Sequence, residues 1–247
     1  MSESDSLTIA IAARLAAIQA RMDAAFERRA AGLQHAPKPR LIGVSKRQPL
    51  IKLTAAHAAG LRDFGENYAQ ELRDKQRDWP QSDLRWHYIG ALQTNKLKYL
   101  VGKTALIHTV DRPELITAID QRAARARGVQ PFLIEVGLAG EQQKAGIGPE
   151  RVPELLDACA TTEHGAARCV GLMVIPPAAD DPEQTRPWFR ALRELRDRLR
   201  GGPERANVEL RELSMGMSAD FEVAIEEGAT LVRVGTAIFG ERSKDAT

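Results

Sequence analysis

The chain has 247 residues, of which 35 are basic, 33 are acidic and 43% are hydrophobic, so it can build a sizeable core and is not an intrinsically disordered chain. The nearly balanced charge, without a dense Lys/Arg block, argues against binding to nucleic acid or to an anionic membrane surface. No apolar run reaches membrane-spanning length, and the acidic start MSESDS is unlike a secretory signal.

The first predicted element is an amphipathic helix over 7–31, rich in alanine, arginine and leucine. Short apolar runs then alternate with longer segments of helical period. The predicted strands are RLIGVSK, RDFGEN, RWHYIG, ALIHTVD, PFLIEVGL, CVGLMVIP, ELRELSMG and LVRVGTA. The predicted helices cover 50–59, 68–78, 94–100, 113–127, 149–161, 182–200 and 219–227, and a short helix follows Gly235.

Eight strand–helix units in a chain of this length predict a single (β/α)8 TIM barrel with an extra N-terminal helix. The rival fold is a doubly wound open sheet, which more often has a glycine-rich turn after its first strand, and GVSKRQ contains no GxGxxG. We expect one domain over 1–247, with a helical segment at 1–39, the barrel at 40–240 and a tail at 241–247.

Lys46 stands at the end of the first predicted strand, where a barrel keeps its functional residues. Partial desolvation at that position favours a neutral, nucleophilic amine, which is suited to forming a Schiff base with an aldehyde. The alternative is a lysine that reaches solvent or pairs with a carboxylate such as that of Glu66.

Small hydroxyl residues and glycine end the last two strands, at Ser214, Gly235 and Thr236. Backbone amides and hydroxyls in such a position favour a phosphate, and barrels often bind one after strands seven and eight. The alternative is that these residues only build tight turns. Because strands one and eight are neighbours in a closed barrel, a ligand with both an aldehyde and a phosphate would fit, and pyridoxal 5′-phosphate (PLP) is such a ligand.

Arg233 shares a strand face with Gly235, so it points inward if Gly235 lines the pocket. Its guanidinium would then donate to a pyridine nitrogen and discourage protonation of the ring. The alternative is an interior arginine paired with Glu135 or Glu212.

Two pairs of residues have structural interpretations. His87 and His108, in the third and fourth predicted strands, are expected to be hydrogen-bonded inside the barrel, with a general base near the ring as the alternative. Cys159 and Cys169 have neither metal-ligand nor disulfide-framework spacing, so we expect two reduced thiols in a cytoplasmic protein and no metal site.

Several ordered motifs together resemble those of the pyridoxal phosphate homeostasis proteins, single-domain relatives of the alanine racemase N-terminal barrel with a fold-type III PLP site. The resemblance runs over about 41–240 and rests on GVSK, FGENY, WHYIGALQTNK, HTVDR, EQQKAGI, GLMVIP, LSMGMSADFEVAI and VRVGTAIFG. It implies that Lys46 forms the Schiff base, that Asn67 lies beside the cofactor and that Arg233 faces the ring nitrogen. It also implies that the phosphate is held by Ser214, Gly235 and Thr236.

Two positions add detail to the resemblance. Gly137 stands where the family more often has asparagine, and Lys144 lies in a family-like motif, where it either guides an anionic ligand or is a solvated loop lysine.

The resemblance implies a cytoplasmic PLP-binding protein that contributes to vitamin B6 cofactor homeostasis as a carrier or buffer. We expect a monomer without firm catalytic turnover, with PLP-dependent apoenzymes as possible recipients. One alternative is a PLP-dependent racemase or decarboxylase of the alanine racemase type. A chain that stops soon after the eighth unit, without a tyrosine-supplying C-terminal domain, argues against it. Another is a phosphosugar aldolase that uses Lys46 without PLP.

Overall fold

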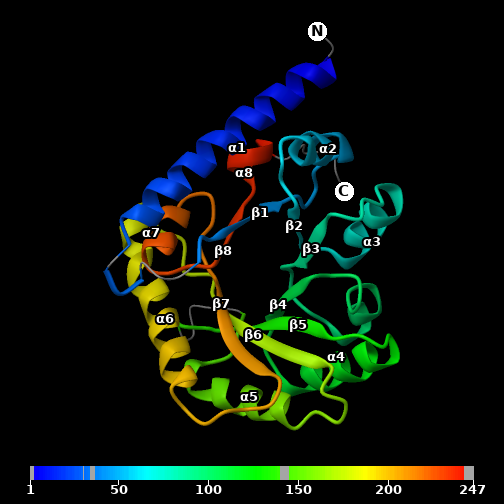
Figure 1. Cartoon of the computed structure of the whole chain (residues 1–247), viewed down its shortest axis with the longest axis vertical. Helices are drawn as coiled ribbons and strands as arrows, with labels where there is room; N and C mark the ends of the chain where they lie inside the picture. Colours follow the sequence, from blue (N-terminus) through cyan, green and yellow to red (C-terminus); the bar gives the residue numbers. More distant parts are fainter. Residues whose placement is uncertain (1–2, 30, 34–36, 140–144, 242–247) are drawn as a thin grey trace.

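The computed structural model describes residues 3–29, 31–33, 37–139 and 145–241. Eight parallel strands close into a barrel in sequential order, with β1 paired to both β2 and β8 (Figure 1). The strands are β1 (Arg40–Val44), β2 (Asp63–Glu66), β3 (Arg85–Tyr88), β4 (Leu106–Val110), β5 (Gln130–Glu135), β6 (Ala167–Met173), β7 (Val208–Ser214) and β8 (Leu231–Val234). The predicted barrel is confirmed, and the doubly wound open sheet is excluded.

Helices follow the strands on the outside of the barrel. The α-helices are α1 (Glu3–Glu27), α2 (Leu50–Ala58), α3 (Ala69–Asp78), α4 (Pro113–Arg125), α5 (Val152–Ala160), α6 (Arg186–Arg200), α7 (Phe221–Glu226) and α8 (Thr236–Phe239). The 3-10 helices are η1 (Ala31–Leu33), η2 (Thr94–Tyr99), η4 (Pro149–Arg151) and η5 (Pro182–Thr185). The segment predicted as a helix at 94–100 is thus a 3-10 helix. None of the helices within the described residues is long and apolar enough to cross a membrane.

The extra helix α1 packs along the outer flank of the barrel against α2, α7 and α8 (Figure 1). Its buried residues, which include Ile11, Leu15, Ile18 and Met22, recur every three or four positions and so form one apolar face. Just after α1, the buried Arg29 donates to the carbonyl oxygens of Ile225 and Ala229 at 2.7 and 2.6 Å. The helix is therefore part of the packed barrel, where it covers its first and last units.

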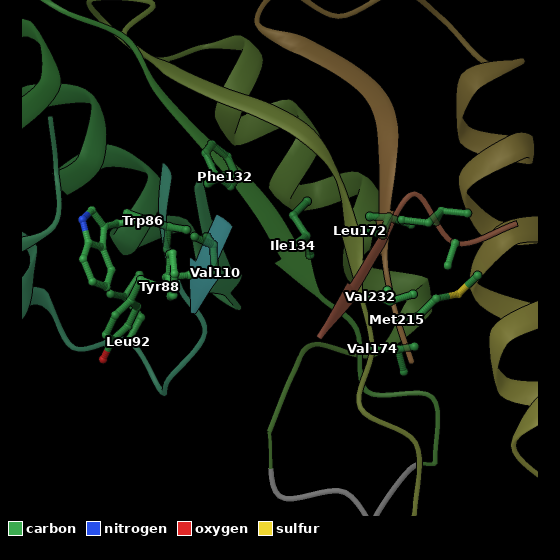
Figure 2. Packing of buried hydrophobic residues seen from close by; sticks show 14 of the residues in the cluster. Trp86, Tyr88, Leu92, Val110, Phe132, Ile134, Leu172, Val174, Met215 and Val232 are labelled. Carbon is green, nitrogen blue, oxygen red and sulfur yellow. The ribbon is translucent and has the colours of Figure 1, made fainter. Parts of the chain in front are cut away.

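Two apolar clusters form the core. Figure 2 shows part of the larger cluster, which packs between the strands and the surrounding helices. The smaller cluster contains Ile42, Leu106, Leu133, Val170, Met173 and Leu231. Alternation along the strands puts His108 on the same face as Leu106, and Arg233 on the same face as Leu231. The barrel interior therefore carries polar as well as apolar side chains.

Candidate functional site

A cavity of about 330 Å³ lies where the C-terminal ends of β1, β2 and β8 meet the loop after β7. Its polar lining residues are Lys46, Gln48, Asn67, Ser218, Arg233 and Thr236. Gly235 also lines it, and Val44, Ile89, Ile175 and Met217 give it apolar walls. The cavity brings together five of the six residues that the sequence nominates, and Ser214 is the exception. A larger hollow of about 580 Å³ beside the α6–β7 connection contains none of them.

Backbone contacts from α3 hold both neighbours of Lys46. Lys75 Nζ donates to the carbonyl oxygen of Ser45 at 2.7 Å, and the Arg47 amide donates to Glu71 Oε1 at 2.6 Å. Arg47 has a φ of 57°, in the left-handed region, so the chain turns sharply directly after Lys46. These contacts fix the backbone that presents the partly buried Lys46 side chain to the cavity.

Lys75 also organises the buried carboxylate of Glu66. Glu66 Oε1 accepts from Lys75 Nζ at 2.7 Å and from Ser45 Oγ at 2.6 Å, while Lys75 Nζ contacts Glu71 Oε1 at 2.7 Å. Burial raises the pKa of Glu66 to about 7 even though the ammonium group of Lys75 opposes this shift. Glu66 is thus a partner of Lys75. Sequence reasoning missed Lys75 because a lysine on an outer helix usually reaches solvent.

Asn67 supplies a polar atom that lacks a partner. Its Oδ1 is buried and accepts no hydrogen bond from the described residues. Most buried polar atoms are hydrogen-bonded, so an unpaired acceptor that faces a cavity indicates a position for a ligand donor. The backbone at Gly90 packs closely against the backbone of Asn67, because a Cβ at residue 90 would collide with the Asn67 carbonyl group.

The opposite side of the cavity is built by the N-terminus of α8 and the loop after β7. Gly235 and Thr236 begin α8, and the Gly235 amide donates to Ser218 Oγ at 3.3 Å. The Ser218 loop is shaped by Asp220, whose carboxylate accepts from the Met217 amide at 2.6 Å. A Cβ at residue 235 would lie 3.3 Å from the Cβ and carbonyl oxygen of Val44, so glycine lets the end of β8 approach the end of β1 closely. Two hydroxyls and backbone amides therefore face a common space.

Ser214 lies beneath this cavity and does not line it. Its hydroxyl is fully buried, 2.6 Å from Arg233 Nη1 and 2.9 Å from His108 Nδ1. The phosphate contact of Ser214 stays a prediction, and both neighbours of its hydroxyl are inside the barrel. Ser218, four residues later in the same SMGMS motif, is the serine that lines the cavity.

Arg233 is buried and reaches the cavity from β8. Nη1 donates to Ser214 Oγ at 2.6 Å and Nη2 to the Val174 carbonyl oxygen at 3.0 Å. Burial lowers the pKa of Arg233 to about 10, while the charges of Asp220 and Glu135 oppose the decrease. In the described part of the chain it has no carboxylate within ion-pair distance, so the predicted alternative of a pair with Glu135 or Glu212 is wrong.

The two barrel histidines are hydrogen-bonded inside the barrel, as the sequence predicts. His87 Nδ1 lies 3.0 Å from His108 Nε2, and His87 Nε2 lies 2.9 Å from Asp63 Oδ1. Neither histidine is among the residues that line the cavity.

Glu135 ends β5 and lies inside the barrel near the charges of Asp111 and Arg233. Burial and Asp111 raise the pKa of Glu135 to about 7 from an ordinary value of 4.5, although Arg233 opposes the shift. The folded protein therefore binds this proton more tightly than the unfolded chain does. The stabilisation from Glu135 is complete below about pH 4.5 and is lost as the pH rises through 7.

We expect Glu135→Gln, which cannot titrate, to gain about 2 kcal/mol of unfolding free energy relative to the parent between pH 5 and pH 8. Urea unfolding at several pH values in that range measures this difference. The exposed Glu150→Gln serves as the control and should show none. Parallel pH profiles for parent and Glu135→Gln would contradict the assignment.

Two further positions stand out in the resemblance, Gly137 and Lys144. Gly137 donates its amide to the Ile147 carbonyl oxygen at 2.8 Å, and a Cβ there would lie 3.3 Å from the Ala145 carbonyl oxygen. An asparagine would therefore be crowded by the returning loop. Lys144 lies outside the described residues. Within the described ranges, no group of three or more His, Cys, Asp or Glu side chains is arranged to hold a metal ion.

The cavity combines three chemical features in one space. Lys46 supplies an amine, Arg233 supplies N–H donors with a positive charge, and Ser218 and Thr236 supply hydroxyls beside backbone amides. Apolar walls between them suit a flat ring. A small aromatic molecule with an electrophilic carbon and an anionic group is the ligand class that this set of donors accommodates.

Comparisons with known proteins show the family and the fold. Residues 20–243 match the family model described as alanine racemase, N-terminal domain. A pyridoxal phosphate homeostasis protein of Aquifex aeolicus is 48% identical over 229 residues, which cover 93% of this chain and 97% of the relative. The structure of PipY from Synechococcus elongatus with PLP bound is 34% identical and superposes with a TM-score of 0.77, covering 93% and 100% of the two chains. An alanine racemase from Corynebacterium glutamicum shares the fold at 17% identity, with a TM-score of 0.67 and coverage of 91% and 63%.

Proposed function

Since this chain belongs to the family of pyridoxal phosphate homeostasis proteins, we propose that it binds PLP in the cavity at the end of the barrel and acts as a carrier or buffer of the cofactor. One observation carries the proposal. Lys46, just after β1, lines the same cavity as Arg233 on β8 and as Gly235 and Thr236 at the start of α8. PLP supplies an aldehyde that forms a Schiff base with a primary amine.

The residues present fit PLP on three counts. Asn67 lines the cavity and its buried Oδ1 is an unpaired acceptor, for which a phenolic hydroxyl is a suitable donor. Gly235 and the hydroxyl residues Thr236 and Ser218 line the cavity together, and backbone amides with hydroxyls suit a phosphate. The cavity volume of about 330 Å³ is at the low end of the usual range for small-molecule sites.

Each side chain has a distinct role in this proposal. Lys46 holds the aldehyde carbon, and the α3 contacts on Ser45 and Arg47 keep its backbone in place. Arg233 donates to the pyridine nitrogen and keeps that nitrogen unprotonated, because its own positive charge disfavours a second cation nearby. Thr236 and Ser218 donate to the phosphate. Ser218 takes the phosphate role that we expected for Ser214.

The arrangement supports binding and release over catalytic turnover. Among the described residues that line the cavity, Lys46 and Arg233 are the titratable ones, and Arg233 is poorly suited to act as a base. Tyr88, the most buried tyrosine, donates to the Ala91 carbonyl oxygen away from the cavity. The racemase or decarboxylase alternative predicts sustained turnover of an amino acid, and we expect none with alanine, serine or lysine.

A phosphate-specific variant tests the orientation of the ligand. We expect Thr236→Val to weaken PLP binding by about 1.5–3 kcal/mol, the usual loss for a hydrogen bond to a charged group. Binding of pyridoxal, which lacks the phosphate, should not change. Equilibrium titrations followed by absorbance measure both affinities.

The matched control is Thr117→Val, the same substitution at an exposed position of α4. It should alter neither affinity. An equal loss of PLP and pyridoxal binding in Thr236→Val would place the phosphate elsewhere in the cavity.

We further propose a cytoplasmic monomer that delivers PLP to PLP-dependent apoenzymes. The two free, buried cysteines Cys159 and Cys169 are typical of a reducing compartment.

The functional proposal is tested by loading the purified apoprotein with PLP and measuring stoichiometry, release and transfer. We expect one PLP per chain and restored activity of an added apo-aminotransferase. Failure to take up PLP would overturn the proposed function, and uptake without release would overturn the carrier role. Light scattering on the loaded protein measures the oligomeric state, and a stable dimer would contradict the monomer.

A further inference from the structure

A line of buried polar side chains crosses the inside of the barrel and ends at the cavity. We call it the core chain, and its members are Asp63 on β2, His87 on β3, His108 on β4, Ser214 on β7 and Arg233 on β8. Successive polar atoms along it are 2.9, 3.0, 2.9 and 2.6 Å apart. At its far end Asp63 also accepts from Arg85, which is half exposed at the start of β3.

The two ends of the core chain determine the direction of every hydrogen bond in it. Burial disfavours the Asp63 carboxylate, but hydrogen bonds from Arg85 and His87 hold its pKa below the ordinary range, so Asp63 only accepts. Arg233 only donates. His87 Nε2 must therefore carry a proton, which leaves Nδ1 as an acceptor.

The same reasoning extends to the middle of the chain. His108 donates from Nε2 to His87 and accepts at Nδ1 from the Ser214 hydroxyl, whose oxygen accepts from Arg233. This arrangement gives each of the three central groups one donor and one acceptor, and all are used. Burial lowers the pKa of both His87 and His108, which favours the neutral rings that it requires.

The core chain gives the buried Arg233 a hydrogen-bond acceptor in addition to the more distant charges of Asp220 and Glu135. Arg233 has no carboxylate within ion-pair distance in the described residues, and burial of an unpaired charge is costly. Four hydrogen bonds that all point toward Asp63 present the acceptor side of the Ser214 hydroxyl to the guanidinium. At the far end the Asp63 carboxylate is paired with Arg85 and lies 3.9 Å from Arg40. Hydrogen bonds aligned in this way polarise one another in a low-dielectric interior.

We propose that the core chain positions Arg233 and sustains its charge at the cavity, so that its other members influence bound PLP only through the pyridine ring. Ser214, His108, His87 and Asp63 are then positioning residues that do not touch the ligand. The inference rests on the proposed function, because Arg233 is taken to face the ring nitrogen. It also gives Ser214 a role different from a phosphate contact.

Comparison of PLP with pyridoxal separates these roles. We expect Ser214→Ala to weaken binding of PLP and of pyridoxal by the same factor, about 3- to 10-fold, since one hydrogen bond to Arg233 is lost. Ser218→Ala should weaken PLP binding alone. Thr104→Ala is the control. It removes a buried hydroxyl that donates to the Leu100 carbonyl oxygen and is not part of the core chain, so it should change neither affinity. A loss confined to PLP in Ser214→Ala would overturn the inference and restore the phosphate contact.

A second variant acts from the far end. Asp63→Asn removes the charge but keeps a carbonyl acceptor for His87. Ser214→Ala removes a hydrogen bond that positions Arg233, so its charge should disfavour ring protonation less strongly and the pH-dependent change in the absorption of bound PLP should move to higher pH. In Asp63→Asn a negative charge is lost while Arg233 stays protonated, so we expect the same change to move to lower pH. Unchanged spectral pH profiles in both variants would show that the core chain stabilises the fold without influencing the bound PLP.

The histidine tautomers can be read directly in the apoprotein. With five histidines in the chain, ¹⁵N NMR of histidine-labelled protein resolves each ring after assignment with single variants. We expect His87 and His108 to carry their proton on Nε2, with Nδ1 unprotonated, between pH 6 and 8. A proton on Nδ1 of either ring would overturn the assigned direction. If the tautomers are as expected but the parent protein takes up no PLP, the proposed function is wrong while the hydrogen-bond directions in the core chain are confirmed.

Discussion

In the Lys46→Ala variant we expect the covalent link to PLP to be lost while the fold is kept. The partly buried Lys46 side chain can be shortened without disturbing the backbone contacts of Ser45 and Arg47 with α3. Arg233 and the hydroxyl groups remain, so weak non-covalent binding should persist. Affinity should decrease at least about tenfold, which corresponds to about 1.4 kcal/mol.

Absorption spectra and PLP titrations measure these changes, and thermal unfolding of the apoprotein tests the fold. Lys98→Ala, at an exposed position on η2, is the control for removing a lysine and should bind PLP as the parent does. An unfolded Lys46→Ala variant would make the lysine structural. A variant that keeps the full affinity and the spectrum of the parent would remove Lys46 from the site.

The second large effect concerns stability. Lys75→Met should lower the free energy of unfolding by about 3–5 kcal/mol near pH 8, because it leaves the buried Glu66 carboxylate without its cation. The loss should be smaller at pH 5. Burial already raises the pKa of Glu66 to about 7, and removing the ammonium raises it further, so Glu66 is protonated in the folded variant at low pH.

Urea unfolding at pH 5 and pH 8 measures this difference. Addition of Glu66→Gln to Lys75→Met should restore part of the lost stability, because no buried charge is then left. Lys38→Met breaks an exposed pair with Asp23 and should cost no more than about 1 kcal/mol. A loss equal in size at both pH values would show that Lys75 contributes packing alone.

Much of the fold could be predicted because the strand–helix alternation is local. The predicted strands β5 and β6 extended too far, since Val136 and Val174 are buried and apolar yet lie beyond the ends of the pairing. An apolar residue reports burial and does not distinguish the end of a strand from the first loop residue. The 3-10 geometry of η2 was missed for a similar reason, because both helix types have nearly the same apolar spacing.

The site was predictable only where position along a strand determines direction. Lys46 and Arg233 follow from the end of a strand and from strand alternation. The choice between Ser214 and Ser218 depends on Gly216, whose φ of 91° turns the chain between them, and a sequence does not report that angle. Lys75 has no local signal at all, because its contacts with Ser45 and Glu66 come from tertiary packing.

Borohydride reduction of the PLP-loaded protein, followed by peptide mass mapping, tests the central claim most directly. Reduction makes the link between aldehyde and amine permanent, so the modified peptide identifies the residue that holds the cofactor. We predict one pyridoxyl group per chain, on the peptide that contains Lys46. A pyridoxyl group on another lysine, or no adduct in a protein that has taken up PLP, would contradict the account.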